Sequence, residues 1–223
     1  MNQQSVANRI AVFDIDGTII KGFTEFHFFI YLFKKGIINV ADIISLAMYF
    51  ILFRLGFMSV EGLRKKAAGI VDGMKIEKFS QIVKNFFNET IRHRISEKAL
   101  KIIDADKRQE YRIVISTAAF DLIAQGYADI VSADSIIATE IAVCENVING
   151  KVKSVINYGR NKEAKMREFC RNNNVDLAKS KAYANDLSDL FLLKMFGCPI
   201  VCNPDRKMRA IARKNGWREL KLI

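Results

Sequence analysis

Apolar positions along the chain follow one spacing near the N-terminus, a second spacing through the middle and the first again towards the end. Residues 9–14 contain a short apolar run, which is typical of a strand buried in a parallel sheet. From Phe23 to Glu110 apolar residues recur every three or four positions, which indicates amphipathic helices. After Tyr111 short apolar runs alternate with helical segments. This order predicts an α/β fold, a doubly wound, Rossmann-like parallel sheet core with an inserted all-helical cap.

The helical middle of the chain sets the expected domain boundaries. We expect the core to comprise residues 1–20 and 109–223, and the cap to comprise residues 21–108. Within the cap, Ile37–Met58 carries only two charged side chains, Asp42 and Arg54. Its uninterrupted apolar run is well short of the ~20 residues that cross a membrane, so we expect a buried or surface-docking helix. Other cap helices are expected over 23–36, over 60–71 with Ser59 as N-cap, from residue 76 onward, and over 96–110.

The second half of the chain predicts the remaining strands and helices of the core. We expect a strand over 111–117 and a helix that opens at Ala118. Asn149-Gly150 is expected to form a hairpin turn between short strands within 136–155. The remaining expected elements are a helix over 162–173, a strand over 181–184, a helix from residue 190, a strand over 198–202, a helix over 205–215 and a strand over 219–222.

Composition narrows the classes of function. The net charge of +11 would attract anions, such as phosphorylated metabolites, anionic lipid surfaces or nucleic acid, although it could also serve solubility alone. The four cysteines form no CxxC pair and only two histidines occur, which argues against a zinc site. We interpret the cysteines as buried thiols, and Met1–Ser5 lacks the pattern of a signal peptide, so we expect a cytoplasmic location. The P-loop, GxGxxG, GxSxG and HExxH strings are all absent.

Polar side chains gather where the predicted strands end. The clusters are Asp14 with Asp16, Ser116 with Thr117, Lys162 at the start of a helix, and Asn185 with Asp186 and Asp189. In open parallel sheets the ligand site lies at the carboxyl ends of the strands, so these clusters are expected to meet. Two carboxylates at the end of a buried strand are costly unless something uses them, and a divalent cation with a phosphoryl group would do so.

In order and spacing, these four clusters resemble the four motifs of the haloacid dehalogenase (HAD) superfamily of phosphohydrolases. The string Ile10–Ile20 (IAVFDIDGTII) is the most specific part of the resemblance, which covers nearly the whole chain. It is closest to the phosphoserine-phosphatase-like branch, which carries a helical C1 cap between its first two motifs, and residues 197–205 resemble the end of that branch. The resemblance implies that Asp14 is the nucleophile and Asp16 the general acid/base.

The same resemblance implies the rest of the site. Thr117 and the backbone from Ala118 would bind phosphate, with Ser116 as a competitor for Thr117. Lys162 would provide the fixed positive charge, with Lys165 as a competitor. Mg²⁺ would be held by Asp14, the backbone of Asp16, Asn185 and Asp189.

The fourth cluster departs from the common form Gly-Asp-x-x-x-Asp, because Ala184 and Asn185 stand where the glycine and first aspartate are expected. Either the site tolerates a weaker ligand, or Asp186 replaces it, or activity has been lost.

The expected function is therefore a Mg²⁺-dependent phosphatase that hydrolyses a phosphate monoester through an aspartyl phosphate. The alternatives are a phosphotransferase and a catalytically weakened homologue that binds anions or membranes. In phosphoserine phosphatases a glutamate follows the nucleophile by nine residues. Phe23 stands there in this chain, with Glu25 as the nearest acid, which counts against phosphoserine. The apolar helix suggests a lipid phosphomonoester or peripheral contact with an anionic membrane, and ordinary cap packing is the alternative. A small-molecule substrate is the other candidate, no nucleic-acid partner is expected, and the sequence does not indicate an oligomeric state.

Overall fold

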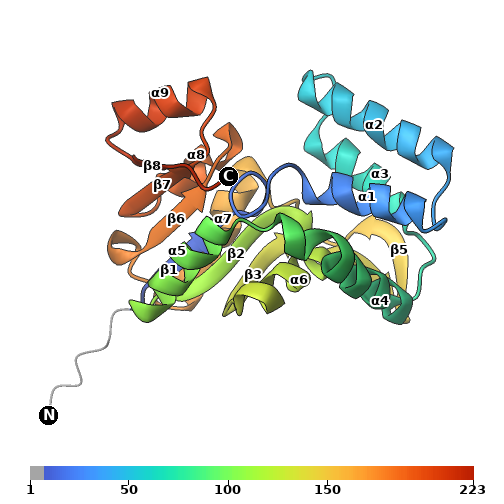
Figure 1. Ribbon diagram of the computed structural model, residues 1–223, viewed down its shortest axis with the longest axis horizontal. Coiled ribbons are helices and arrows are strands. Elements are labelled where there is room, and N and C mark those ends of the chain that lie inside the picture. Colours follow the sequence, from blue (N-terminus) through green and yellow to red (C-terminus); the bar gives the residue numbers. More distant parts are fainter. Residues whose placement is uncertain (1–7) are drawn as a thin grey trace, which may run out of the picture.

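The computed structural model describes residues 8–223, so the N-terminal Met1–Ser5 and the first seven residues of the expected core lie outside the described part. Six parallel strands form one sheet in the order β3-β2-β1-β6-β7-β8 (Figure 1). A separate two-stranded antiparallel sheet pairs β4 with β5. The strands are β1 (Ile10–Phe13), β2 (Arg112–Phe120), β3 (Ser135–Thr139), β4 (Ile141–Cys144), β5 (Val147–Val152), β6 (Lys181–Ala184), β7 (Cys198–Cys202) and β8 (Arg218–Leu220).

Strand β1 lies in the middle of the sheet because all four of its side chains are apolar and can be buried on either face. It pairs in parallel with β2 on one side and β6 on the other. Phe13 stacks on Tyr183 of β6, with ring centroids 4.3 Å apart. The carboxyl ends of these three central strands therefore lie at the same edge of the sheet, which places the polar residues that follow them near one another.

Helices cover both faces of the sheet, which confirms the predicted doubly wound α/β core. Helices α5 and α6 pack against one face, and α7, α8 and α9 pack against the other. The helices are α1 (Thr24–Lys34), α2 (Val40–Arg54), α3 (Val60–Ile70), α4 (Ile76–Phe86), α5 (Glu97–Arg108), α6 (Asp121–Val131), α7 (Gly159–Asn172), α8 (Leu190–Leu193) and α9 (Arg206–Lys214). A π-helical turn spans Phe87–Ile91, and short 3₁₀ turns span Arg92–Arg94, Leu177–Lys179 and Leu187–Asp189.

Helices α1, α2 and α3 lie together at one end of the molecule, with α2 outermost (Figure 1). Ser59 caps α3 by accepting a hydrogen bond from the Gly62 backbone N–H, as the sequence predicts. Helix α4 packs on α6, and α5 contacts β2 although it lies inside the range assigned to the cap. The exact division of the chain into core and cap remains a prediction. None of the helices within residues 8–223 is long and apolar enough to cross a membrane.

Two predicted local structures and one assignment of burial are wrong. The hairpin turns at Glu145 and Asn146, both at positive φ, whereas Gly150 lies in β5, where the register with β4 shifts. That register is fixed by a third segment, because Gly73, Met74 and Ile76 exchange backbone hydrogen bonds with the hairpin. Strand β2 runs on to Phe120, which pairs with Thr139, so the next helix opens at Asp121 and not at Ala118. Of the four cysteines, Cys144 and Cys198 are exposed.

Candidate active site

The residues that follow strands β1 and β6 meet at one lysine. The Lys162 ammonium, in the first turn of α7, donates to Asp14 Oδ1 at 2.8 Å and to Asp189 Oδ1 at 2.7 Å. Asp14 directly follows β1, and Asp189 ends a 3₁₀ turn after β6. All three side chains are buried, with residue exposures of 7%, 3% and 3% for Asp14, Lys162 and Asp189. A lysine so buried requires charged partners, and these two acids provide them.

Burial and charge act in opposite directions at this centre. Burial raises the pKa of the Asp14 carboxyl above its ordinary value, and the nearby charge of Lys162 only partly offsets that effect. For Lys162, burial lowers the pKa, but the attraction of Asp14 and Asp189 outweighs it and leaves the pKa above the ordinary value. Lys162 is therefore a fixed cation, and the raised pKa of Asp14 results mainly from its burial.

Asp16 is held in place by the start of α1. Its Oδ1 accepts hydrogen bonds from the Thr24 backbone N–H at 2.8 Å and from the Thr24 hydroxyl at 2.5 Å. The Thr24 hydroxyl also lies 2.8 Å from the Tyr127 hydroxyl. Burial raises the pKa of Asp16, and the two hydrogen bonds from Thr24 oppose the rise. A raised pKa favours the protonated form that a general acid must supply.

The second cluster divides between the cavity and the protein interior. Thr117 and Ala118 line the cavity above Asp14, but Ser116 does not. Ser116 is fully buried and accepts a hydrogen bond from the Asn157 side chain, which also donates to the Thr117 and Ile137 carbonyls. The sequence analysis did not identify Asn157, whose position after β5 carries no distinguishing pattern. The geometry favours Thr117 over Ser116 as the residue that can meet a ligand.

The two competing lysines are also separated. Lys162 lines the cavity. The Lys165 ammonium instead donates to the Ala138 carbonyl and the Ser154 hydroxyl, away from the two aspartates.

The fourth cluster, Asn185, Asp186 and Asp189, also lines the cavity, and its three side chains differ in burial and in their contacts. Asp189 is bound to Lys162, whereas Asp186 is exposed and accepts a hydrogen bond from the Ser188 backbone N–H. The Asn185 amide lies against Gly17, in the loop that follows Asp16. Carboxylate and amide oxygens are the ligands that Mg²⁺ prefers, and burial raises the pKa values of both Asp14 and Asp16, so a divalent cation would relieve their charge. The donor set thus fits Mg²⁺ in chemistry, although within residues 8–223 no three acidic, histidine or cysteine side chains form a ready-made metal cluster.

A cavity of about 430 Å³ opens above these residues, between the sheet edge and helices α1, α2 and α3. Its floor is polar and its walls are apolar. The apolar wall residues are Phe23, Phe26, Phe29, Ile30, Ile43, Leu46, Ala47, Phe50, Phe53, Val60, Leu63 and Ala67. A site that combines a charged floor with broad apolar walls suits a ligand with an anionic group at one end and an apolar body.

A buried ion pair in the cavity wall was missed by the sequence analysis. The guanidinium of Arg64 on α3 pairs with the Glu25 carboxylate on α1, and both side chains are largely buried. Burial lowers the pKa of Arg64 to about 10, although the charge of Asp16 opposes the change. The Arg64 Nε has no hydrogen-bond partner among the described residues. The pair depends on how α1 packs beside α3, which the spacing of the sequence does not reveal.

Comparison with solved structures supports the fold. A protein of unknown function from Bordetella pertussis has a TM-score of 0.91 at 18% identity, with 97% of this chain and all of that chain covered. A phosphoserine phosphatase solved as an analogue of its phospho-aspartyl intermediate has a TM-score of 0.66 at 16% identity, with 92% and 90% of the chains covered. Both likenesses confirm the predicted α/β architecture.

Comparison with curated proteins gives relatives that are longer than this chain and align with most of it. A protein named for inhibition of morphological differentiation, from Streptomyces azureus, is 24% identical over 97% of this chain and 79% of its own. A phosphoserine phosphatase of Mycobacterium tuberculosis is 21% identical over 93% of this chain and 68% of its own. The haloacid dehalogenase-like hydrolase family matches residues 11–194, which is most of the chain. The protein therefore belongs to the haloacid dehalogenase-like hydrolases, as the resemblance of its motifs indicates.

Proposed function

We propose that the protein is a Mg²⁺-dependent phosphatase that hydrolyses phosphate monoesters through an aspartyl phosphate on Asp14. The observation that carries this proposal is the buried contact of Lys162 with both Asp14 and Asp189 at the floor of a cavity. Burying a lysine between two acids costs desolvation energy and adds little to the stability of a core, but such a lysine is suited to binding a phosphate dianion.

The reaction follows from the positions of the two aspartates of the first cluster. Asp14 attacks phosphorus, and the bond between phosphorus and the alcohol oxygen breaks. Asp16, oriented by Thr24, gives its proton to the departing oxygen. In the second half, Asp16 takes a proton from water as the water attacks the aspartyl phosphate. Inorganic phosphate leaves, and both carboxyl groups return to their starting states.

The neighbouring residues bind and orient the phosphoryl group. Lys162 holds Asp14 in position and balances its negative charge, and Thr117 with the Ala118 backbone would contact the phosphoryl oxygens. Asp14, the Asp16 carbonyl, Asn185 and Asp189 would hold Mg²⁺, with Asp186 as the alternative to Asn185. Bound Mg²⁺ reduces the repulsion between a phosphate dianion and a carboxylate.

The cavity walls favour an apolar alcohol as the leaving group, either a lipid or a bulky small molecule. Phosphoserine remains the second candidate, since the Arg64–Glu25 pair offers the two charges that its carboxylate and amino groups would need. We rank it second because Arg64 and Glu25 already pair with each other.

The first test is hydrolysis of an aryl phosphate with and without Mg²⁺ by wild type and Asp14→Asn. The matched control is Asp129→Asn, a conservative change of an exposed acid on α6. We expect Mg²⁺-dependent turnover in wild type and the control and loss of at least ~10³-fold in Asp14→Asn, because the nucleophile is removed. Borohydride reduction of the trapped acyl phosphate should locate the modification at Asp14. Turnover that survives Asp14→Asn would contradict the mechanism.

A second assay addresses the substrate and the competing reaction. Release of phosphate from lysophosphatidate is compared with release from phosphoserine under the same conditions, and glycerol is added as an acceptor. A preference for the lipid supports the apolar leaving group, and a preference for phosphoserine would overturn our ranking. Formation of glycerol phosphate in place of inorganic phosphate would identify a phosphotransferase.

A further inference from the structure

Helix α2 exposes an apolar stripe whose residues do not line the cavity. The stripe consists of Val40, Ile44, Met48, Ile51 and Leu55, spaced so that all five lie on one face, and Phe57 follows it at the end of the helix. Their exposed fractions range from 51% to 79%. We call these six residues the outer apolar face. Nine of the thirteen large apolar residues that are exposed within residues 8–223 lie between Phe23 and Phe57, so this exposure is concentrated at one end of the molecule.

The residues on another side of α2 form the wall of the cavity, so the outer apolar face is a separate surface. Ile43, Leu46, Ala47 and Phe50 point to the cavity and form part of its wall. Helix α2 is thus apolar on two sides, and packing within the fold accounts for only one of them. A capping box stabilises the start of α2, where Asn39 and Asp42 exchange side-chain and backbone hydrogen bonds.

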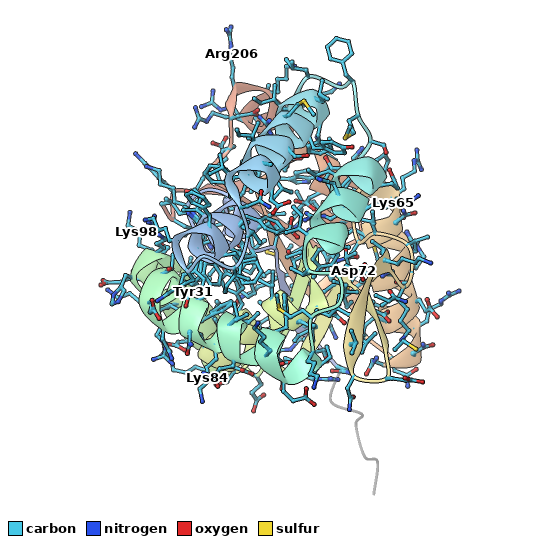
Figure 2. All side chains as sticks on the ribbon, turned by 90° about the vertical axis from the view of Figure 1, so that its right-hand side faces the viewer. Tyr31, Lys65, Asp72, Lys84, Lys98 and Arg206 are labelled. Atoms are coloured by element: carbon cyan, nitrogen blue, oxygen red, sulfur yellow. The ribbon has the colours of Figure 1, made fainter. Side chains whose placement is uncertain are left out.

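The charges around the outer apolar face are mostly positive. From Phe33 to Lys66 the chain holds six basic and two acidic side chains, and of the basic ones Arg64 is buried against Glu25 and Lys35 pairs with Glu89. Lys34 and Lys35 are exposed just before α2, and Arg54, which also lines the cavity, is exposed at its end. Lys65 is exposed on α3, which contacts α2 (Figure 2). Asp42, one of the two acids, is engaged in the capping box.

We propose that the outer apolar face docks on the surface of an anionic lipid bilayer, with α2 lying flat in the interface. Apolar side chains would enter the acyl boundary while the flanking lysines and arginine meet lipid phosphates. A second copy of the chain is a poorer occupant, because a symmetric contact would bring the same basic residues of both copies together. In this orientation only helix α2 would separate the cavity from the membrane. The inference does not depend on the phosphatase chemistry.

The test is flotation with vesicles of phosphatidylcholine, with and without phosphatidylglycerol. The variant Ile44→Glu/Ile51→Glu changes two exposed residues that do not line the cavity. The control Val143→Glu/Val155→Glu places the same two charges on other exposed apolar positions, 43% and 60% exposed. Ile44→Ser/Ile51→Ser separates the loss of apolar surface from the added charge.

We expect wild type and the Val143/Val155 control to float with the phosphatidylglycerol vesicles, and Ile44→Glu/Ile51→Glu to bind at least about tenfold less. The serine variant should show an intermediate loss. Equal flotation of wild type and the glutamate variant, binding that ignores phosphatidylglycerol, or no binding by wild type would each overturn the proposal. The proposal would also be overturned if size-exclusion chromatography showed that wild type forms a dimer through this face and flotation showed no binding to vesicles.

Asp14→Asn separates this inference from the proposed reaction. It should bind vesicles as wild type does, and Ile44→Glu/Ile51→Glu should hydrolyse a soluble aryl phosphate at the wild-type rate. If wild type shows no hydrolysis but floats with the vesicles, the proposed function fails and the docking surface stands.

Discussion

The amide of Asn185 lies directly against the backbone of Gly17, so closely that residue 17 has no room for a Cβ. Gly17 also adopts a positive φ of 74° and accepts a hydrogen bond from the Asn203 side chain at its carbonyl oxygen. Asn203 in turn accepts from the Leu222 and Ile223 backbone N–H groups. The loop after Asp16 is therefore fixed between the fourth cluster and the end of the chain.

Gly17→Ala should lower both stability and activity. The positive φ costs about 1 kcal/mol for alanine, and the added methyl group would displace Asn185 from the site. Gly36→Ala is the matched control, because Gly36 has a similar φ of 66° but open space around its Cβ position. We expect both variants to lose unfolding free energy in denaturant titrations, with the larger loss in Gly17→Ala, and kcat/KM to fall by at least ~10-fold in Gly17→Ala alone. Full activity in Gly17→Ala would show that the position of Asn185 is unimportant.

Asn185→Asp should strengthen Mg²⁺ binding if Asn185 is a ligand, because it adds a negative charge to the donor set. We expect the Mg²⁺ concentration for half-maximal turnover to fall by about tenfold, the effect of ~1.4 kcal/mol. Asp186→Asn tests the alternative ligand and should leave the Mg²⁺ dependence unchanged. A large rise in the Mg²⁺ requirement of Asp186→Asn, with no effect at residue 185, would reassign the ligand to Asp186.

Lys162→Met should abolish activity and reduce stability, because Asp14 and Asp189 would then face each other without a cation. We expect a loss of at least ~10²-fold in kcat/KM and ~3 kcal/mol or more in unfolding free energy. Lys165→Met removes a lysine from the same helix whose partners are a carbonyl and a serine hydroxyl. It should retain at least half of the wild-type turnover, and a comparable loss there would move the catalytic charge to Lys165.

Asp14→Asn should stabilise the metal-free protein at neutral pH while it removes activity. Burial raises the pKa of Asp14 in the folded state, so the folded form binds a proton more tightly than the unfolded form. The stability contributed by this proton is present below the ordinary pKa and is lost as the pH rises through the raised pKa. In EDTA, the melting temperature of Asp14→Asn should exceed that of wild type by ~2–4 °C at pH 8, about 1 kcal/mol, and by less near pH 4. A lower melting temperature at pH 8 would mean that the bond to Lys162 outweighs the cost of burial.

Thr24→Val should impair the proton transfer assigned to Asp16, because it removes the hydroxyl that donates to the Asp16 carboxylate and leaves only the hydrogen bond from the backbone N–H. Alkyl phosphates have poor leaving groups and need protonation, whereas activated aryl phosphates do not. We expect kcat to fall at least about tenfold for an alkyl phosphate and much less for p-nitrophenyl phosphate. Tyr127→Phe removes only the hydroxyl that contacts the Thr24 hydroxyl and should show a smaller change of the same kind. Equal losses on both substrates would assign Thr24 a purely structural role.

The pattern of the sequence was sufficient for the sheet, because strands such as Ile10–Phe13 are buried on both faces and read as continuous apolar runs. Once the strands are parallel, their ends must meet, so Asp14, Lys162 and Asp189 converge as predicted. Their catalytic and metal-binding roles remain predictions.

Features that depend on packing between distant segments could not be predicted from the sequence. The Arg64–Glu25 pair forms only because α3 lies beside α1. Likewise, Glu145-Asn146 and Asn149-Gly150 both suit a turn, and pairing with the segment around Met74 decides between them. The apolar segment Ile37–Met58 could be recognised as a helix, but which of its faces is left exposed could not.

The central place of β1 also bears on how the protein acquires its activity during synthesis. The strand that precedes Asp14 is made first, yet its two neighbours are formed by residues 112–120 and 181–184. Such long-range parallel pairing forms slowly, since distant segments must meet before any contact compensates for the lost chain entropy. Asp14 and Lys162 cannot meet until most of the chain has emerged and folded, so the recovery of turnover would report on completion of the sheet, later than the recovery of helical content.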